Sequence, residues 1–102
     1  MGAALFGEAV SARQAESWGL IWRVVPDDAL AATLADVTAT LAAGPTRAYA
    51  ATKAALHASS GNTLAQQFDL ECRLQRELGY TDDYLEGMRA FAEKRPPAFT
   101  GT

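Results

Sequence analysis

The hydrophobic positions of this chain recur mainly at helical spacing. One stripe repeats at intervals of three and four residues: Leu30, Leu34, Val37 and Leu41. Such a stripe predicts an amphipathic helix that turns its apolar side toward a core. A carboxylate just before the stripe, from Asp27 or Asp28, is expected to cap the first turn of this helix.

Glycine and proline divide the chain into segments that mostly have helical length. The breakers are Gly7, Gly19, Pro26, Gly44–Pro45, Gly61, Gly79 and Pro96–Pro97. Besides the helix above, the sequence predicts helices over Met1–Leu5, from a Ser11–Gln14 capping box to Trp18, from Pro45 to Ser59, from a Thr63–Gln66 capping box to Leu78, and from Asp82 to Lys94. Each glycine is expected to end a helix in the left-handed conformation.

The segment Leu20–Val25 has the composition of a β-strand. It holds Ile21, Val24 and Val25, three of the five Val and Ile residues in the chain, and β-branched residues favour strands. A single strand cannot satisfy its own backbone N–H and C=O groups. The short strand predicted near residues 20–25 therefore needs a pairing partner from another segment or another chain.

The predicted helix after Thr63 has a wide apolar arc. Two stripes bound the arc, Leu64, Phe68 and Cys72 on one side and Leu70, Leu74 and Leu78 on the other. Gln67, Glu71 and Gln75 fall inside the arc, where polar groups need hydrogen-bond partners. Two interpretations stay open: a central helix whose polar groups reach loops, and a helix at a subunit interface.

The composition predicts a thin core. Of 102 residues, 49% are hydrophobic, but 22 are Ala and only 20 are Leu, Ile, Val or Phe. Alanine has the highest helix propensity and adds little buried area per residue. We therefore expect one mainly α-helical unit, or a piece of a larger protein, whose stability depends on a partner surface.

Charge and cysteine content argue against several classes of protein. Nine Lys and Arg against twelve Asp and Glu give a net charge of −3, which offers no basic footprint for nucleic acid. No apolar run predicts a membrane span, and residues 1–10 lack the basic region of a signal peptide. A single cysteine, Cys72, is compatible with a reducing compartment. A cytoplasmic protein is expected.

The residue inventory predicts neither a catalytic nor a metal centre. The only histidine, His57, and the only cysteine, Cys72, lie in different predicted helices without ligand spacing, which argues against nucleophilic triads and zinc sites. No two glycines stand within three positions of each other, so no phosphate-binding fingerprint occurs. The pairs Asp27–Asp28 and Asp82–Asp83 are interpreted as residues of helix N-termini, where anions are favoured.

A cluster near residue 91 is the candidate ligand site. The last predicted helix presents Tyr84, Met88 and Phe91 on one face. Lys94 stands three positions after Phe91 and shares its side of the helix, so a ring and a cation can hold a nucleotide-like ligand by stacking and charge. The alternative is an ordinary last turn, in which Lys94 and the neighbouring Arg95 complement the helix dipole.

Three stretches of the chain carry a family pattern. They are SARQAESWGLIWRVVP at Ser11–Pro26, AGP at Ala43–Pro45 leading to TKA at Thr52–Ala54, and LEGMRAFAEKRP at Leu85–Pro96. The pattern closely resembles the C-terminal portion of enoyl-CoA hydratase/isomerase (crotonase) family proteins, and the resemblance covers essentially the whole chain. Further residues resemble the phenylacetate-degradation branch, the 1,2-epoxyphenylacetyl-CoA isomerases: Asn62–Leu64, Asp69–Glu71, Asp83–Tyr84 and Phe99–Gly101.

The resemblance implies a C-terminal helical segment of a crotonase (ClpP/crotonase-like) fold. It assigns residues 1–26 to the tail end of the crotonase core, with the short strand, and residues 27–102 to a C-terminal helical association domain. Family enzymes act on coenzyme A thioesters without a further cofactor, and they stabilise an enolate with two backbone N–H groups while carboxylates move protons. Those groups belong to an upstream part of the family chain, so no catalytic residue is assigned here and no turnover is expected from these residues alone.

The resemblance also implies a ligand role and partners. The last helix of the family offers an aromatic ring and a lysine toward coenzyme A bound at a neighbouring subunit, and Phe91 and Lys94 match those positions. Gln75 stands where some relatives place a further aromatic residue. Full-length members associate as trimers or dimers of trimers, so self-association is expected, without nucleic acid or membrane. An alternative of a different class is a free-standing helical interaction module without catalysis, which binds a partner helix through Leu64–Leu78.

Overall fold

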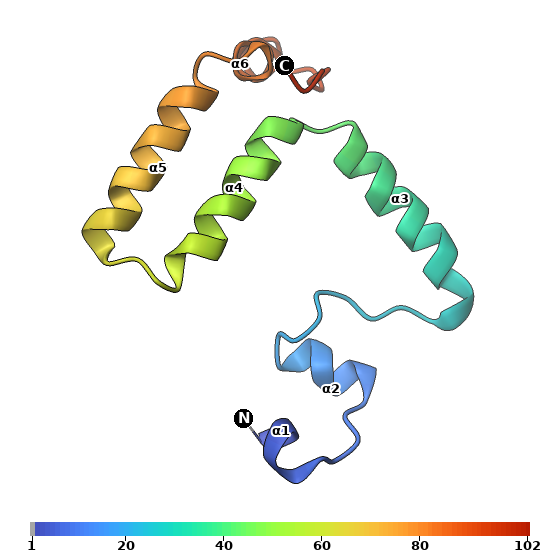
Figure 1. Ribbon diagram of the computed structural model, residues 1–102. Helices are drawn as coiled ribbons and strands as arrows, with labels where there is room; N and C mark the ends of the chain where they lie inside the picture. The colour runs from blue at the N-terminus through green and yellow to red at the C-terminus, as the bar shows by residue number, and fades with distance from the viewer. Residues whose placement is uncertain (1) are drawn as a thin grey trace. The chain divides into compact units, whose positions relative to one another are not determined.

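A computed structural model describes residues 2–102, with side chains from Ala4 onward. The helices are α1 (Gly2–Phe6), α2 (Ala12–Ser17), the 3₁₀ helix η1 (Asp27–Ala29), α3 (Leu30–Ala42), α4 (Thr46–Ser59), α5 (Leu64–Leu78) and α6 (Asp82–Glu93) (Figure 1). Strands are absent from this part of the chain, so the mainly helical prediction is confirmed. None of the described helices is long and apolar enough to cross a membrane.

The chain divides into two compact units, one ending at Asp36 and the other covering Val37–Thr102. These units reflect packing within this chain. The predicted division at residues 26 and 27 concerns the place of each part in a larger fold, and it therefore stays a prediction. The predicted helix over Met1–Leu5 corresponds to α1, except that Met1 lies outside the described residues.

The strand predicted near residues 20–25 is wrong for this chain. The segment is irregular, because no other described segment offers it a hydrogen-bonded ladder. Its backbone groups bond locally instead: the Leu20 N–H donates to the Ala15 carbonyl at 2.9 Å, and the Val24 N–H donates to Glu16 Oε1 at 2.9 Å. The Glu16 carboxylate thus accepts a backbone hydrogen bond that a carbonyl of a neighbouring strand would otherwise accept.

The predicted capping box is complete at the start of α5 and half formed at the start of α2. Thr63 Oγ1 accepts from the Gln66 N–H at 3.4 Å, and Gln66 Oε1 accepts from the Thr63 N–H at 2.8 Å, which completes the reciprocal box. At α2, the first half of the box is present, since Ser11 Oγ accepts from the Gln14 N–H at 3.2 Å.

The capping role predicted for Asp27 or Asp28 is wrong. Pro26 occupies the N-cap of η1, and both carboxylates lie in the first turn. Pro26 has a φ of −57° and a ψ of 150° and provides no side-chain cap. The two carboxylates therefore sit near the positive end of the helix dipole without bonding its free N–H groups.

Only some of the helix-ending glycines are left-handed. Gly7 and Gly19 have φ of 64° and 72°, as predicted. The prediction is wrong for Gly79, which caps α5 with φ of −61° while its N–H bonds to Gln75 and Glu77, and for Gly44 and Gly61, whose φ is not positive. Gly79 continues the right-handed coil, so its backbone conformation does not require a residue without Cβ. Gly44 is needed for a different reason, because a Cβ there would clash with the Tyr49 ring.

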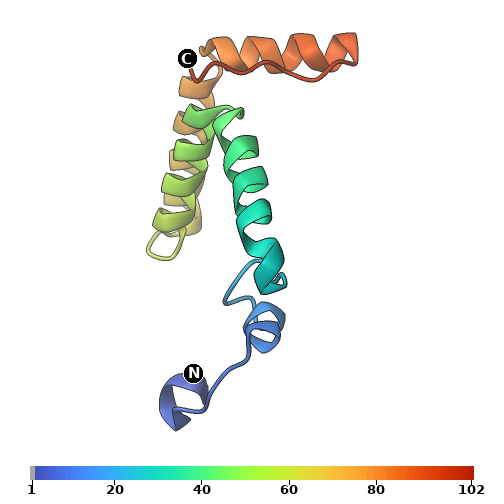
Figure 2. The same ribbon diagram turned by 90° about the vertical axis from the view of Figure 1, so that its right-hand side faces the viewer.

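The helices α4 and α5 lie side by side as a hairpin in both views (Figures 1 and 2). Polar groups inside the apolar arc of α5 help to join them. Gln67 Nε2 donates to the Ala55 carbonyl of α4 at 3.3 Å, and Gln67 Oε1 accepts from Asn62 Nδ2 at 2.9 Å. Glu71 Oε1 accepts from Gln67 Nε2 at 2.8 Å. For Gln67, these bonds support the interpretation of a central helix that reaches its neighbour and a loop.

The helix α6 crosses the end of this hairpin, and the C-terminal residues run back along it (Figure 2). The core is thin, as predicted, because Ala90 is the buried hydrophobic residue among the described side chains. The stripe on α3 is not core-facing within this chain, since Leu34 is 62% exposed and Leu30 and Leu41 are also exposed. Apolar surface is therefore left open on α3, α5 and α6.

Candidate functional site

The start of α6 is fixed by a buried threonine. Thr81 Oγ1 accepts from the Tyr84 N–H at 3.2 Å and donates to the Leu78 carbonyl at 2.7 Å. One hydroxyl thus caps α6 and closes the end of α5. An N-cap of this kind contributes about 1 kcal/mol to helix stability, and here it also fixes the turn between the two helices.

The end of α6 is a Schellman turn built on a lysine. The Arg95 N–H donates to the Ala90 carbonyl at 3.1 Å and the Lys94 N–H donates to the Phe91 carbonyl at 3.4 Å, which is the hydrogen-bond pair of that motif. Lys94 has φ of 55° and ψ of 36°. It is the one non-glycine residue with positive φ in residues 2–102, at a position where glycine is strongly preferred.

This turn brings the predicted ligand pair together. Lys94 Nζ lies 4.5 Å from the centroid of the Phe91 ring, within the range of a cation–π contact. Phe91 is 77% exposed and Lys94 is exposed as well. The pair therefore presents an aromatic face and a positive charge to the surroundings of the chain, and its binding role stays a prediction.

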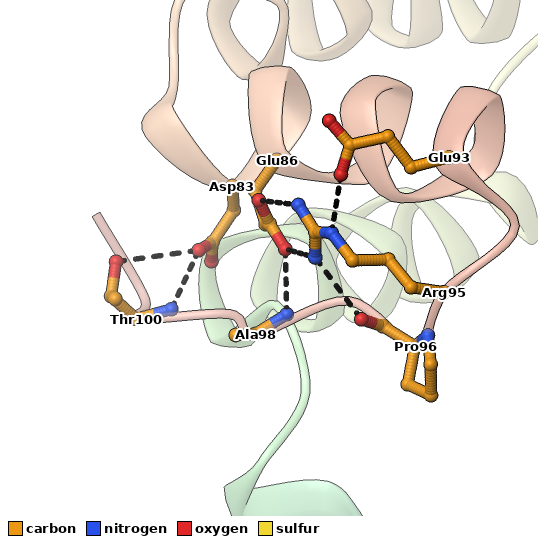
Figure 3. A network of polar contacts seen from close by, with 7 residues as sticks. All are labelled: Asp83, Glu86, Glu93, Arg95, Pro96, Ala98 and Thr100. Carbon is orange, nitrogen blue, oxygen red and sulfur yellow. Dashed lines mark hydrogen bonds and ion pairs between the residues drawn. The ribbon is translucent and has the colours of Figure 1, made fainter.

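The residues after α6 form a strap, Arg95–Thr102, that lies along the helix (Figure 3). The Arg95 guanidinium makes a bidentate ion pair with Glu86, at 2.5 Å and 3.0 Å, and its Nε donates to Glu93 at 2.6 Å. Glu86 Oε1 also accepts from the Ala98 N–H at 2.8 Å. The Arg95 guanidinium is therefore paired with Glu86 and Glu93, whereas the Lys94 ammonium group lies near the Phe91 ring.

A second carboxylate holds the far end of the strap. Asp83 is 6% exposed, and its Oδ1 and Oδ2 accept from the N–H groups of Thr100 and Gly101 at 2.7 Å and 2.9 Å. The Asp83 N–H donates to the Thr102 carbonyl at 3.2 Å. Bonds of this charge-assisted kind are stronger than neutral ones, so the strap is fixed at both ends of its course.

In the ion pair between Glu86 and Arg95, each partner shifts the pKa of the other toward the charged form. The hydrogen bond from Arg95, followed by that from the Ala98 backbone, lowers the pKa of Glu86 from 4.5 to about 2, and the charge of Arg89 acts in the same direction. The hydrogen bonds to Glu86 and Glu93 raise the pKa of Arg95. Glu86 therefore stays ionised far into the acidic range.

An apolar groove of about 460 Å³ lies beside α6. Its walls include Gln75, Leu78, Tyr84, Met88, Phe91 and Phe99. Tyr84, Met88 and Phe91 thus share a face, as the sequence predicts. The strap supplies Phe99, whose ring approaches Gly87: a Cβ at this glycine would lie 3.8 Å from Phe99 Cε1. Gln75 stands in the wall of the groove, at the position where the resemblance expects a further aromatic residue.

His57 and Cys72 lie on different helices, away from the groove at α6. His57 lies on α4, and Cys72 is an exposed free thiol on α5. Within residues 2–102, His, Cys, Asp and Glu residues form no group that could hold a metal ion. Neither residue lines the groove at α6.

Sequence reasoning missed Asp83 and Glu86. Asp82 and Asp83 lie in the first turn of α6, as the sequence predicts, but Thr81 is the cap and Asp83 also binds the strap. The three-residue spacing of Asp83 and Glu86 places both carboxylates on one side of α6. That spacing alone does not identify their partners, which lie 9 to 18 residues further along the chain.

Comparison with known proteins gives the class of protein. The fold matches an enoyl-CoA hydratase from Mycobacterium marinum with a TM-score of 0.84 and 32% identity, over 97% of this chain and 39% of that chain. An enoyl-CoA hydratase from Polaromonas sp. JS666 matches with a TM-score of 0.87 and 27% identity, over 94% and 37% of the two chains. The helices therefore form a segment of the crotonase fold.

The sequence comparisons give the family. The family sequence model described as Enoyl-CoA hydratase/isomerase matches residues 1–102. A probable enoyl-CoA hydratase from Rhodobacter capsulatus is 50% identical over 101 residues, and the 1,2-epoxyphenylacetyl-CoA isomerase of Escherichia coli K12 is 46% identical over 101 residues. The chain belongs to the enoyl-CoA hydratase/isomerase family. It spans 39% and 38% of the lengths of these two relatives, and 99% of its own length is covered.

Proposed function

We propose that this chain is the helical C-terminal portion of an enzyme that acts on acyl-CoA thioesters. Its own part in that enzyme is to associate subunits and to contribute Phe91 and Lys94 to the coenzyme A pocket. The observation that carries this proposal is the exposed contact between the Phe91 ring and the Lys94 ammonium group. Such a pair suits a ligand that combines a nucleobase with phosphates, because the base can stack on the ring while the cation attracts the phosphates.

The backbone of Lys94 supports a ligand role. Left-handed backbone costs an L-residue about 1–2 kcal/mol relative to the right-handed form, and glycine would avoid this strain. Strain of this kind clusters at binding sites and active sites. A lysine at a position that favours glycine is explained if its side chain is needed for binding.

The open apolar surface supports the association role. Leu34 on α3, Phe68 on α5 and Met88 on α6 are all more than half exposed. Apolar side chains gain free energy when a partner removes them from water, at about 25 cal/mol per Å². Covering by other subunits, or by further parts of the same protein, would provide that gain.

The free-standing interaction module remains the second candidate. Leu64 and Phe68 on α5 are exposed, and a partner helix can pack on them without any coenzyme A. The two candidates differ in their response to coenzyme A, since only the first requires Phe91 and Lys94 to touch a ligand.

The acyl group is proposed from the more specific resemblance. We propose a ring-containing substrate of the 1,2-epoxyphenylacetyl-CoA type, supported by the residues shared with that branch at Asn62–Leu64, Asp69–Glu71 and Phe99–Gly101. The 46% identity to the Escherichia coli isomerase is consistent with this, and the 50% identity to a probable hydratase supports hydration as the competing reaction.

The ligand role is tested in a hybrid enzyme. The matching portion of the Escherichia coli isomerase is replaced by this chain, so that the remaining walls of the pocket are present. Phe91→Ala and Lys94→Ala are each expected to raise KM for the acyl-CoA about tenfold and to leave kcat nearly unchanged, because they remove binding that ground state and transition state share.

Matched controls separate this effect from general damage. Tyr80→Ala removes an exposed ring between α5 and α6, and Lys53→Ala removes an exposed cation on α4, so neither should change KM. Unchanged KM in both α6 variants of an active hybrid would remove the ligand assignment. Detection of hydration or double-bond migration by the 102 residues alone would contradict the expected lack of turnover.

A further inference from the structure

The backbone of Lys94 is held in a conformation that its own side chain disfavours. Residues with a Cβ rarely adopt a φ of 55° with a ψ of 36°. Such conformations persist only where the surrounding structure over-determines them. The contacts that impose the conformation of Lys94 must therefore be identified in the neighbouring segments.

Those contacts come from the strap Arg95–Thr102. The chain reverses direction at Lys94 and then runs back along α6, where Glu86 binds Arg95 and Ala98 and Asp83 binds the last residues (Figure 3). A right-handed residue at position 94 would continue the helix and carry the strap away from both carboxylates. The reversal and the two carboxylate contacts therefore depend on each other.

The strap also meets α4, at the other side of the groove. A Cβ on Gly101 would lie 2.6 Å from Thr46 Oγ1, and Gly101 has φ of 80°. The end of the strap thus fits closely between Asp83 of α6 and the first residue of α4. This close approach restricts the path of the strap further, and with it the direction in which the chain leaves Lys94.

We propose that Asp83 and Glu86 are positioning residues: by holding the strap against α6, they keep Lys94 left-handed and its ammonium group over the Phe91 ring. The importance of that pair for coenzyme A rests on the proposed function. The positioning of Lys94 by the strap does not rest on the proposed function, because it is defined by contacts within this chain.

The variants are chosen to release the strap in different ways. Asp83→Asn replaces one of the two acceptor oxygens by a donor, and Glu86→Ala removes the partner of Arg95 and Ala98. Thr100→Pro removes the N–H that Asp83 Oδ1 accepts and leaves the sequence of α6 intact. Asp82→Asn is the matched control, because it makes the same chemical change on an adjacent, exposed residue.

The readout is the nuclear Overhauser effect between the amide and α protons of Lys94 in the 102-residue chain. A positive φ brings these two protons close together, so the signal is strong in the unaltered protein. We expect it to weaken in the three variants that release the strap and to stay strong in Asp82→Asn. The amide signals of α5 serve as the check that the hairpin has kept its fold.

A strong Lys94 signal in all three variants, with α5 unchanged, would overturn the proposal. If Asp83→Asn also loses the α5 signals, Thr100→Pro decides, because it does not alter the helix. In the hybrid enzyme, the same three variants should raise KM by the same factor as Lys94→Ala. Failure of Lys94→Ala to change KM would remove the proposed function alone, whereas a normal Lys94 signal in the variants would remove the positioning role alone.

Discussion

At the scale of single residues, Lys94 combines a side-chain cation beside an aromatic ring with an unfavourable backbone conformation. Its ammonium group lies 4.5 Å from the centroid of the Phe91 ring, while its φ of 55° is a value that suits glycine. Lys94→Gly and Lys94→Ala are therefore expected to affect stability differently, whereas both should weaken ligand binding.

Lys94→Gly should stabilise the chain and weaken binding. Relief of the left-handed strain, less the added chain entropy of glycine, is expected to contribute about 0.5–1 kcal/mol. Lys94→Ala keeps the strain and should leave stability nearly unchanged. Thermal unfolding followed by circular dichroism at one protein concentration measures the difference between the two variants.

Lys94→Gly and Lys94→Ala also separate an effect on stability from an effect on ligand binding. Both substitutions remove the cation, so both should raise KM in the hybrid enzyme. A Lys94→Gly variant that is less stable than Lys94→Ala would show that the left-handed turn costs nothing, and the strain argument for a ligand role would fail.

At the scale of elements, the strap depends on the charge of Glu86. Its pKa is lowered from 4.5 to about 2 in the folded chain. A carboxyl group whose pKa is depressed by folding stabilises the folded form at any pH above its ordinary value, and this contribution is lost as the pH falls from 4.5 toward 2. The contact of Glu86 with the strap should therefore persist through mildly acidic conditions.

The Ala98 amide signal reports this titration, because its N–H donates to Glu86 Oε1. Its chemical shift is expected to stay constant from neutral pH to below 4.5 and to move as the pH approaches 2. Glu86→Gln should abolish this step, since an amide does not titrate. A midpoint close to 4.5 in the unaltered protein would contradict the strength assigned to the pairing with Arg95.

At the scale of the whole molecule, the thin core is the dominant property. Ala90 is the buried hydrophobic residue among the described side chains, while Leu34 and Phe68 are exposed. Small domains bury a modest share of their surface even when their cores are rich in large side chains. The described residues therefore gain little from their own packing and have much to gain from other protein.

The purified chain should self-associate in a concentration-dependent manner in sedimentation velocity. Leu34→Glu and Phe68→Glu are expected to weaken the association, because each places a charge on apolar surface that association would bury. Thr38→Glu on α3 adds the same charge at an exposed polar position and should have a smaller effect. A monomer at all concentrations would contradict the association role.

The sequence by itself determined most helix positions and the proximity of Phe91 and Lys94. Helix starts such as the Thr63–Gln66 box use hydrogen bonds within one turn, and Phe91 and Lys94 stand three positions apart at the end of one helix, so local patterns suffice to predict them. The family resemblance is likewise carried by contiguous residues.

The tertiary structure decided the features whose partners are distant in the sequence. Residues 20–25 form no strand, because a ladder requires a second segment that the described residues do not supply. Asp83 lies in the first turn of α6, as predicted, but its hydrogen bonds to the strap, like those of Glu86, were not predicted, because their partners lie 9 to 18 residues away. Lys94 is left-handed because that strap must return along α6. Hydrogen bonds within one turn can be inferred from neighbouring residues, whereas the return of the strap depends on where the folded chain places its carboxylates.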